Sequence, residues 1–240
     1  MRAGTTKKTT RRADPVAVMR DFTLPYSAAE SWLYDFWIAP AVMALRPALM
    51  ERLIPELPEG AEVLEVGCGG GHLAVELLER RGDLRYVGLD LSADQVGRAR
   101  RRLGGANHAE LVQGSALDLP FDSGRFDAVI SVASIKHWPD PARGVSECVR
   151  VLAPGGLLAI VEADRGCTLD DANALVSRLK MPRALLPLAL ALFRTWVAGR
   201  SLDLDEARTV LAAQRLEGAE VTRLEGTPAL FMTGHAPSTG

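Results

Sequence analysis

An apolar run that ends in a cluster of glycines constrains the fold of this chain more than any other feature. Residues 63–77 read VLEVGCGGGHLAVEL, so a strand-like segment stops at Gly67, Gly69, Gly70 and Gly71 and resumes with helical periodicity. Glycine is costly to order on folding, so such a cluster needs a reason. A glycine loop between a strand and a helix lets the backbone approach a ligand, and the helix start offers free N–H groups. The segment therefore predicts a site for an anionic or polar ligand.

Short runs rich in valine, leucine and isoleucine alternate with amphipathic stretches from residue 61 onward. The expected strands are Val63–Val66, Tyr86–Leu89, Glu110–Gln113, Asp127–Val132, Leu157–Val161, Ala219–Leu224 and Ala229–Thr233. The expected helices are His72–Arg81, Ser92–Leu103 (with Ser92 and Gln95 as a capping box) and Ala142–Leu152, the last ended by APGG at 153–156. Strand–helix alternation predicts an α/β fold with a doubly wound, mostly parallel seven-stranded sheet and helices on both faces.

Composition shifts divide the chain into segments. Residues 1–14 are basic and are expected to form a disordered tail, and residues 15–57 are expected to form a helical N-terminal arm. Residues 58–235 hold the alternating pattern, with a wholly helical insertion expected at 164–216 and a short tail at 236–240. Within the insertion, 182–199 is very apolar, but Pro187 and Arg194 interrupt it and it falls short of a membrane span of roughly 20 apolar residues.

Charge and cysteine content exclude several classes. The net charge of −2 over 240 residues gives no support to a nucleic-acid binder. The three cysteines lie far apart and the four histidines lack metal-ligand spacing, so neither a disulfide framework nor a metal site is expected. A reducing cytoplasm is the expected location.

The spacing of the glycines within the loop narrows the class of ligand. A dinucleotide loop of the form G-x-G-x-x-G is not met, because position 72 is histidine; the spacing present is E-x-G-x-G-x-G, from Glu65 to Gly71. Asp90 ends the next strand, in YVGLD, where a carboxylate can accept hydrogen bonds from both ribose hydroxyls of a nucleoside. A surface-facing acid after a strand is the alternative.

Four segments, in this order and spacing, resemble the class I S-adenosylmethionine-dependent methyltransferases, and especially their quinone-biosynthesis and small-molecule branch. They are VLEVGCGGGHLAVEL, YVGLDLSADQVGRAR, VQGSALDLPFDSGRFDAVISVASIKHWPD and VLAPGG, and they cover roughly residues 60–162. The resemblance implies a Rossmann-like domain with S-adenosyl-L-methionine as cofactor. It leaves the first 57 residues and the 164–216 block uncovered, the parts that choose a substrate in such enzymes.

The resemblance also implies roles for individual residues. The amino-acid end of the cofactor would lie against Glu65, Gly67, Gly69 and Gly71. Asp90 would bind the ribose hydroxyls, and Leu91 would lie against the adenine face. Ser115 and Ala116 would border the adenine edge, and Ser131 would lie beside the methionine portion. The family often has aspartate where Ser115 stands, and an uncharged hydrogen bond there is weaker by about 1 kcal/mol.

Methyl transfer needs a base only if the acceptor must lose a proton. The candidate for a catalytic base is His137 in SIKHWPD, although His137 and Trp138 can equally pack or cap the following turn. The aromatic residues Tyr26, Trp32, Tyr34 and Trp37 either belong to a core or line the mouth of a substrate pocket together with Trp138. The apolar 182–199 piece can be a lid over a greasy substrate, a homodimer surface or core.

These features favour a methyltransferase acting on an oxygen or carbon atom of a small, largely apolar acceptor. Two alternatives remain: a nicotinamide-dependent reductase, which the glycine spacing argues against, and a non-catalytic S-adenosylmethionine-binding protein on the same fold. Nucleic-acid and protein substrates are not favoured, because SVAS stands where base-methylating enzymes carry an NPPY-like tetrapeptide.

Overall fold

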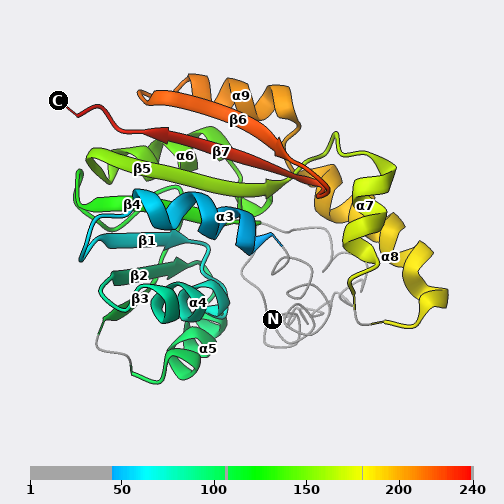
Figure 1. The fold of residues 1–240 in the computed structure, drawn as a ribbon, viewed down its shortest axis with the longest axis horizontal. Helices are drawn as coiled ribbons and strands as arrows, with labels where there is room; N and C mark the ends of the chain where they lie inside the picture. The colour runs from blue at the N-terminus through cyan, green and yellow to red at the C-terminus, as the bar shows by residue number, and fades with distance from the viewer. Residues whose placement is uncertain (1–44, 106–107, 180, 239–240) are drawn as a thin grey trace, which may run out of the picture.

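A central sheet of seven strands carries the fold (Figure 1). The structure is a computed structural model that describes residues 45–105, 108–179 and 181–238. The strands are β1 (Glu62–Val66), β2 (Arg85–Asp90), β3 (Ala109–Gln113), β4 (Phe126–Val132), β5 (Leu152–Ala163), β6 (Glu217–Leu224) and β7 (Ala229–His235). The expected basic tail, most of the N-terminal arm, and Tyr26, Trp32, Tyr34 and Trp37 lie outside the described residues.

The strand order is β3-β2-β1-β4-β5-β7-β6. β1 to β5 run parallel to one another, whereas β7 is antiparallel to both β5 and β6. The predicted fold class, a mostly parallel, doubly wound seven-stranded sheet, is confirmed. The order reverses between β1 and β4, and open α/β sheets bind ligands at this kind of position, beyond the carboxyl ends of the strands.

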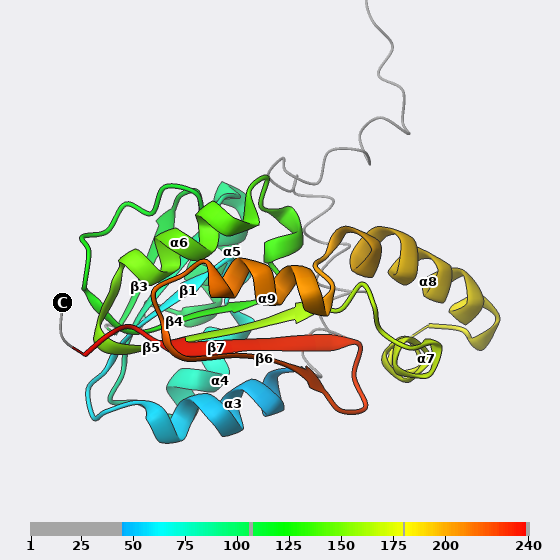
Figure 2. The same ribbon diagram turned by 90° about the horizontal axis from the view of Figure 1, so that it is seen from above.

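Helices cover both faces of the sheet, so its central strands are buried on both sides (Figure 2). One apolar cluster joins α3 (Arg46–Leu53) and α4 (His72–Arg80) to alternate strand residues such as Val63 and Ile130. The other joins α6 (Pro141–Arg150) and α9 (Leu204–Ala212) to the opposite set, including Leu64 and Val129. α5 (Ala93–Leu103) contacts α4, β2 and β3. Because adjacent residues of central strands such as β1 and β4 enter different clusters, the sequences of these strands are nearly continuous apolar runs.

The third predicted helix ends earlier than expected. α6 stops at Arg150, and Leu152 already pairs with Phe126 of β4. The register then shifts, so that Ala128 pairs with Leu157 and the APGG segment forms an irregular start to β5 rather than the end of a helix. Gly155, with φ of +75°, supplies the left-handed turn within this bulge.

The block expected to be wholly helical is interrupted. It contains α7 (Leu169–Val176), the 3₁₀ turn η4 (Arg183–Leu185), α8 (Leu186–Leu192), the π-helical η5 (Phe193–Val197) and the 3₁₀ turn η6 (Ala198–Arg200). No helix covers 164–168, 177–179, 181–182 or 201–203. We call residues 169–200 the helical block. It has its own small apolar cluster, formed around Leu175, Val176 and Phe193.

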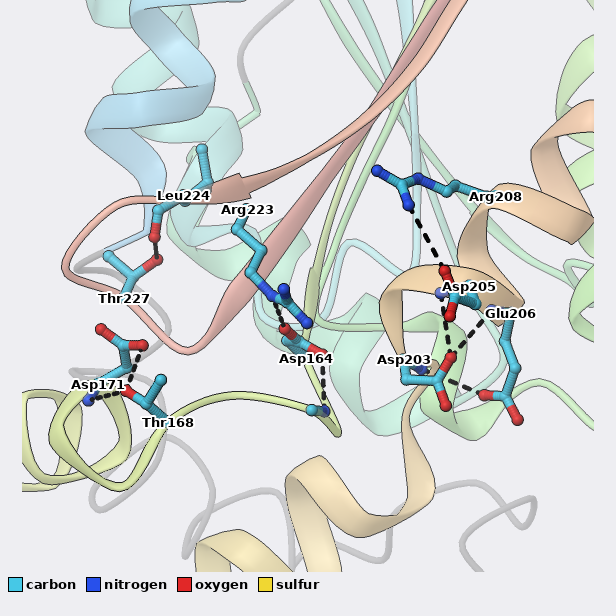
Figure 3. Close-up of polar contacts among 11 residues, drawn as sticks. Asp164, Thr168, Asp171, Asp203, Asp205, Glu206, Arg208, Arg223, Leu224 and Thr227 are labelled. Atoms are coloured by element: carbon cyan, nitrogen blue, oxygen red, sulfur yellow. Dashed lines mark hydrogen bonds and ion pairs between the residues drawn. The ribbon is translucent and has the colours of Figure 1, made fainter.

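Both ends of the helical block are fastened beyond β5, and Figure 3 shows one of the contacts, between Asp164 and Arg223. The buried Asp164 accepts hydrogen bonds from Arg223 Nε of β6 at 2.7 Å and from the Gly166 amide at 2.7 Å. At the other end, Arg165 pairs with Asp203 and Glu206 at the start of α9, each at 2.6 Å. The block therefore leaves and rejoins the sheet at neighbouring positions.

Candidate functional site

The glycine loop lies at the carboxyl end of β1, where the strand order reverses. Gly67, Gly69 and Gly71 all have left-handed backbones, with φ of +80°, +51° and +75°. Gly71 is also the N-cap of α4. L-residues with a Cβ rarely adopt this conformation, so the glycines are needed for the path of the main chain.

The three glycines differ in what surrounds them. A Cβ at Gly67 would lie 2.1 Å from Ser134 Oγ, and a Cβ at Gly71 would lie 3.0 Å from Ala99 Cβ. A Cβ at Gly69 would have no atom of the described residues within 4 Å. The loop is therefore tightly packed on either side of Gly69, whose main chain borders open space that a ligand can approach.

Asp90 lies across this loop and shapes it. Its Oδ2 accepts a hydrogen bond from the Gly69 amide at 2.9 Å, and its Oδ1 accepts one from the Ser92 amide at 2.9 Å. Burial raises the pKa of Asp90, while these two amide bonds oppose that change. Each carboxylate oxygen has a further lone pair, so the side chain that fixes the loop can also accept from a ligand hydroxyl. Leu91, the next residue, is exposed.

Gln95 is a buried polar residue that the sequence indicated only as part of a cap. The Ser92 hydroxyl accepts a hydrogen bond from the main-chain N–H of Gln95 at 3.4 Å, as expected of an N-cap. The Gln95 side chain is itself buried, and its Oε1 has no hydrogen-bond partner among the described residues. A buried acceptor without a partner is costly. An unpartnered acceptor one turn beyond Asp90 fits a site that takes a hydroxyl or amine.

Glu65 lies inside the protein beneath the loop. The Tyr86 hydroxyl donates to its Oε2 at 2.5 Å, and desolvation by burial raises the pKa of Glu65 to about 8. The nearby charge of Arg46 opposes this change, as does the Tyr86 hydrogen bond. The raised pKa favours the neutral, protonated form of Glu65 near neutral pH, and a cation that comes close favours the charged form. Neither Tyr86 nor Arg46 carried a signal in the sequence.

Two residues that were expected to contact the nucleoside lie just after β3. The Ser115 hydroxyl accepts from the Leu117 amide at 3.1 Å, within a short turn that pairs Ser115 with Asp118. Ala116 packs against the apolar cluster under α6 and is partly buried. Gln113 Nε2 donates to the Leu91 carbonyl at 3.2 Å, which ties this edge to the end of β2. Ser115 and Ala116 therefore lie on a strand edge connected to the Asp90 segment.

Ser131 connects the two central strands. Its side chain is fully buried, and its Oγ donates to the Val66 carbonyl at 2.8 Å. This hydrogen bond fixes the end of β4 against the start of the glycine loop. Ser131 is thus close to the loop, as expected, although its hydroxyl proton is committed to the main chain.

The turn after β4 carries the candidate base. His137 is the last residue of the 3₁₀ turn η3 (Ile135–His137), is partly exposed, and has its amide bonded to the Ser134 carbonyl at 2.9 Å. Trp138 is buried against Gly144 of α6, and its Nε1 donates to Ser134 Oγ at 3.0 Å. For Trp138 the structure therefore favours the packing alternative over a place in a substrate pocket.

A buried ion pair that the sequence did not indicate holds this turn. Lys136 Nζ lies 3.5 Å from Glu162 Oε1, and the two side chains are 8% and 1% exposed. Glu162 also accepts from the Lys136 amide at 3.3 Å and from the Ala163 amide at 2.8 Å. Lys136 Nζ donates in addition to the Ala133 carbonyl, whose residue has a φ of +53°. Glu162 thus clamps the turn that carries His137 onto the end of β5.

Within the described residues, no group of three or more histidine, cysteine, aspartate or glutamate side chains could hold a metal ion. The groups that the structure brings together at this edge of the sheet are the glycine loop, the carboxyl groups of Glu65 and Asp90, and the turn after β4.

Part of the chain is similar in sequence to known proteins. Residues 64–160 match the family model described as a methyltransferase domain. A fatty-acid O-methyltransferase from Mycolicibacterium smegmatis is 44% identical over 105 residues, which are 44% of this chain and 38% of that protein. A demethylmenaquinone methyltransferase from Bacillus pumilus is 34% identical over 110 residues, which are 45% of this chain and 47% of that protein. The match thus spans less than half of each relative's length.

The fold has been seen in solved structures. The structure of an S-adenosylmethionine-dependent methyltransferase from Aquifex aeolicus superposes with a TM-score of 0.57 and 18% sequence identity. The superposition covers 82% of this chain and 97% of that one. It therefore extends beyond the segment that matches the family model.

Proposed function

We propose that the protein is a class I, S-adenosylmethionine-dependent methyltransferase that acts on a small hydrophobic molecule, from the premise that residues 64–160 match the methyltransferase-domain family model. The methyl group goes to an oxygen or carbon atom of the acceptor. One observation supports the proposal above the others: the main chain at Gly69 borders open space, and the Asp90 carboxylate lies directly beside it.

The residues at the loop fit S-adenosyl-L-methionine. Gly67 and Gly71 allow the loop to pack closely, and Gly69 leaves room for the amino-acid end of the cofactor. Glu65 beneath the loop suits its ammonium group, and Asp90 suits the ribose hydroxyls. The remaining proposed contacts are Leu91 with the adenine face, Ser115 and Ala116 with the adenine edge, and Ser131 beside the methionine portion. When bound, the cofactor supplies a methyl group on a positively charged sulfur and leaves as a neutral thioether.

The chain's own contribution to the reaction is to position the two reactants and to exclude water. An acceptor hydroxyl must also lose its proton, and we assign this step to the imidazole of His137. The Glu162–Lys136 clamp fixes the turn on which His137 lies. Glu162 and Lys136 are therefore positioning residues in this proposal, not residues that touch the acceptor.

The class of acceptor follows from the relatives and from composition. The two curated relatives named above are a fatty-acid and a demethylmenaquinone enzyme. Tyr26, Trp32, Tyr34 and Trp37 in the N-terminal arm and the apolar helical block are proposed to lie on the acceptor side of the domain. A cytoplasmic location is proposed as well.

Transfer of label tests this function. The full chain is incubated with S-adenosyl-L-methionine that carries a radioactive methyl group and with fatty acids, quinols or phenols, and label should move to an organic-soluble product. Asp90→Ala should weaken cofactor binding, measured by calorimetry, by at least about tenfold, the scale of two lost hydrogen bonds. Tight cofactor binding without transfer to any acceptor would favour the alternative, a non-catalytic S-adenosylmethionine-binding protein.

A further inference from the structure

An apolar helix face on the helical block is open to solvent. Among the described residues, five large hydrophobic side chains are exposed, and three of them lie on η4 and α8: Leu185, Leu188 and Leu192, which are 43%, 58% and 45% exposed. Their spacing of three and four residues places them along one side of a helix. Soluble proteins rarely leave large side chains grouped in this way without a partner.

The inner face of the same helix is already packed against the rest of the block. Leu186, Ala189 and Leu190 pack against the cluster around Leu175 and Phe193, and α7 contacts both α8 and η5. Folding of the block therefore accounts for the inner face and not for the outer one. Figures 1 and 2 both show α7 and α8 projecting beyond the end of the sheet, away from the helices that cover its faces.

The sequence around this face is mostly basic, and the two acidic residues of the helical block, Asp170 and Asp171, lie in the first turn of α7. Between Asp171 and Asp203 the sequence contains five basic residues and no acidic one, although the whole chain carries a net charge of −2. The five are Arg178, Lys180, Arg183, Arg194 and Arg200. Arg178, Arg183 and Arg194 have exposed side chains that flank the leucines in sequence. An apolar stripe within a basic segment is complementary to a surface of anionic lipid headgroups.

Contact with the surface of a membrane fits this segment better than a span across the membrane. By length and composition alone, residues 183–212 make one candidate span among the described residues, 30 residues with a hydropathy of 1.2. However, the helical elements end at Arg200, and Asp203 starts α9 with a capping box. α9 brings the exposed side chains of Asp205 and Arg208, which are unsuited to hydrocarbon. The apolar part is left too short to cross a bilayer.

We propose that the helical block docks on an anionic lipid surface, with Leu185, Leu188 and Leu192 in the acyl boundary and Arg178, Arg183 and Arg194 against the headgroups. The block starts beyond the carboxyl end of β5, which is the edge of the sheet that carries the glycine loop. Docking therefore brings this edge close to the bilayer. If the proposed function holds, a lipid-like acceptor can reach the site without crossing water.

Vesicle flotation tests the docking independently of any activity. The full chain is mixed with vesicles of phosphatidylcholine alone or of phosphatidylcholine and phosphatidylglycerol in equal parts. We expect flotation with the anionic vesicles, at least tenfold less with the neutral ones, and release by high salt. Leu188→Asp with Leu192→Asp should lower the bound fraction at least tenfold, and Arg183→Gln with Arg194→Gln at least fivefold. Arg208→Gln, an exposed arginine on α9, is the control and should bind as the natural chain does.

Several results would overturn the proposal. One is a natural chain that does not float with anionic vesicles. Another is a leucine variant that floats equally well, which would assign the contact to other groups such as the basic residues near the N-terminus. A dimer that becomes monomeric in the leucine variant would mean that a second copy covers the face. Resistance to both salt and alkaline extraction would mean a span. If the double aspartate variant does not show the circular dichroism spectrum of the natural chain, the double variant Leu188→Ser with Leu192→Ser is used in its place.

Discussion

The glycines of the β1–α4 loop share a left-handed backbone and differ in their neighbours, which makes them separable by substitution. Alanine at Gly69 meets open space, so Gly69→Ala should cost the protein only the backbone strain of about 1–2 kcal/mol. The added methyl group would lie where the cofactor is proposed to bind. We therefore expect cofactor affinity, measured by calorimetry, to fall at least about tenfold while the fold persists.

Two matched variants isolate this effect. Gly60 also has a left-handed backbone, with φ of +70°, and open space around it, but it lies before β1. Gly60→Ala should lose similar stability and keep its cofactor affinity. Gly67→Ala should be less stable than either, by roughly 1–3 kcal/mol more, because the new Cβ would collide with the buried Ser134. Equal affinity of the Gly69 and Gly60 variants would contradict the proposed cofactor position.

The raised pKa of Glu65 predicts that the free energy of unfolding depends on pH. Its pKa is about 8 in the folded protein against 4.5 as the ordinary value, so between these pH values the folded state holds a proton that the unfolded state has lost. Stability should therefore fall as the pH rises from about 5 to about 8, by at most about 1.4 kcal/mol per pH unit from this group. Urea unfolding of Glu65→Gln, which stays neutral, should show a shallower decline over the same range.

The same carboxyl group provides a test of the proposed ammonium contact. A cation placed beside Glu65 lowers its pKa, so cofactor binding near pH 7 should release a proton from it. Calorimetric titrations in buffers of different ionisation enthalpy measure that release. Glu65→Gln should bind without it. Identical proton release by the natural chain and the variant would place the cofactor ammonium elsewhere.

The turn η3 depends on a clamp that joins two elements. Lys136 and Glu162 are both buried, and Glu162 also holds two main-chain amides. Glu162→Gln or Lys136→Met alone leaves an unpaired buried charge, and each should destabilise the protein by about 3–5 kcal/mol. The double variant should lose clearly less than the sum, because neither charge then remains. Denaturant unfolding of the four proteins measures this coupling.

The clamp is also expected to act on His137. If Glu162 positions the turn, the double variant should fold, bind the cofactor with natural affinity and show a lower kcat. His137→Asn should lower kcat, and its free energy of unfolding, measured in parallel, separates this loss from any change in stability. A double variant with natural kcat would limit the clamp to a structural role.

Elements with one dominant local signal could be predicted from the sequence, and elements that depend on pairing could not. The predicted core of β1 and the predicted end of β4 agree with the structure, because continuous valine, leucine and isoleucine runs are typical of parallel strands buried on both faces. The end of α6 was misplaced because APGG reads locally as a helix stop, whereas pairing of Leu152 with Phe126 draws this segment into β5. In the site, Glu65 and Asp90 lie in recognisable motifs. Tyr86, Gln95 and Glu162 reach it only through the packing of strands and helices.

Considered as a whole, the molecule has a large sheet domain and a small helical block with a separate apolar cluster. The helices α7, α8 and η5 contact one another, and the block is fastened to the sheet through Asp164 and Arg165. Regions with small cores open locally at a lower free energy than the global one. Amide hydrogen exchange should therefore be faster in α7 and α8 than in β1 and β4.

Arg223 offers a way to loosen the block without touching the sheet. Its Nε pairs at 2.7 Å with Asp164, which is buried, so Arg223→Gln leaves a buried carboxylate without its cation. Amide exchange in α7 and α8 should then accelerate severalfold, and trypsin should cut earlier within 169–200, while exchange in β1 and β4 stays unchanged. Arg208→Gln breaks an exposed pair with Asp205 and should change neither measurement. Uniform acceleration across the sheet and the block in Arg223→Gln would mean that the two unfold as one unit and that the fastening at Asp164 supports the whole fold.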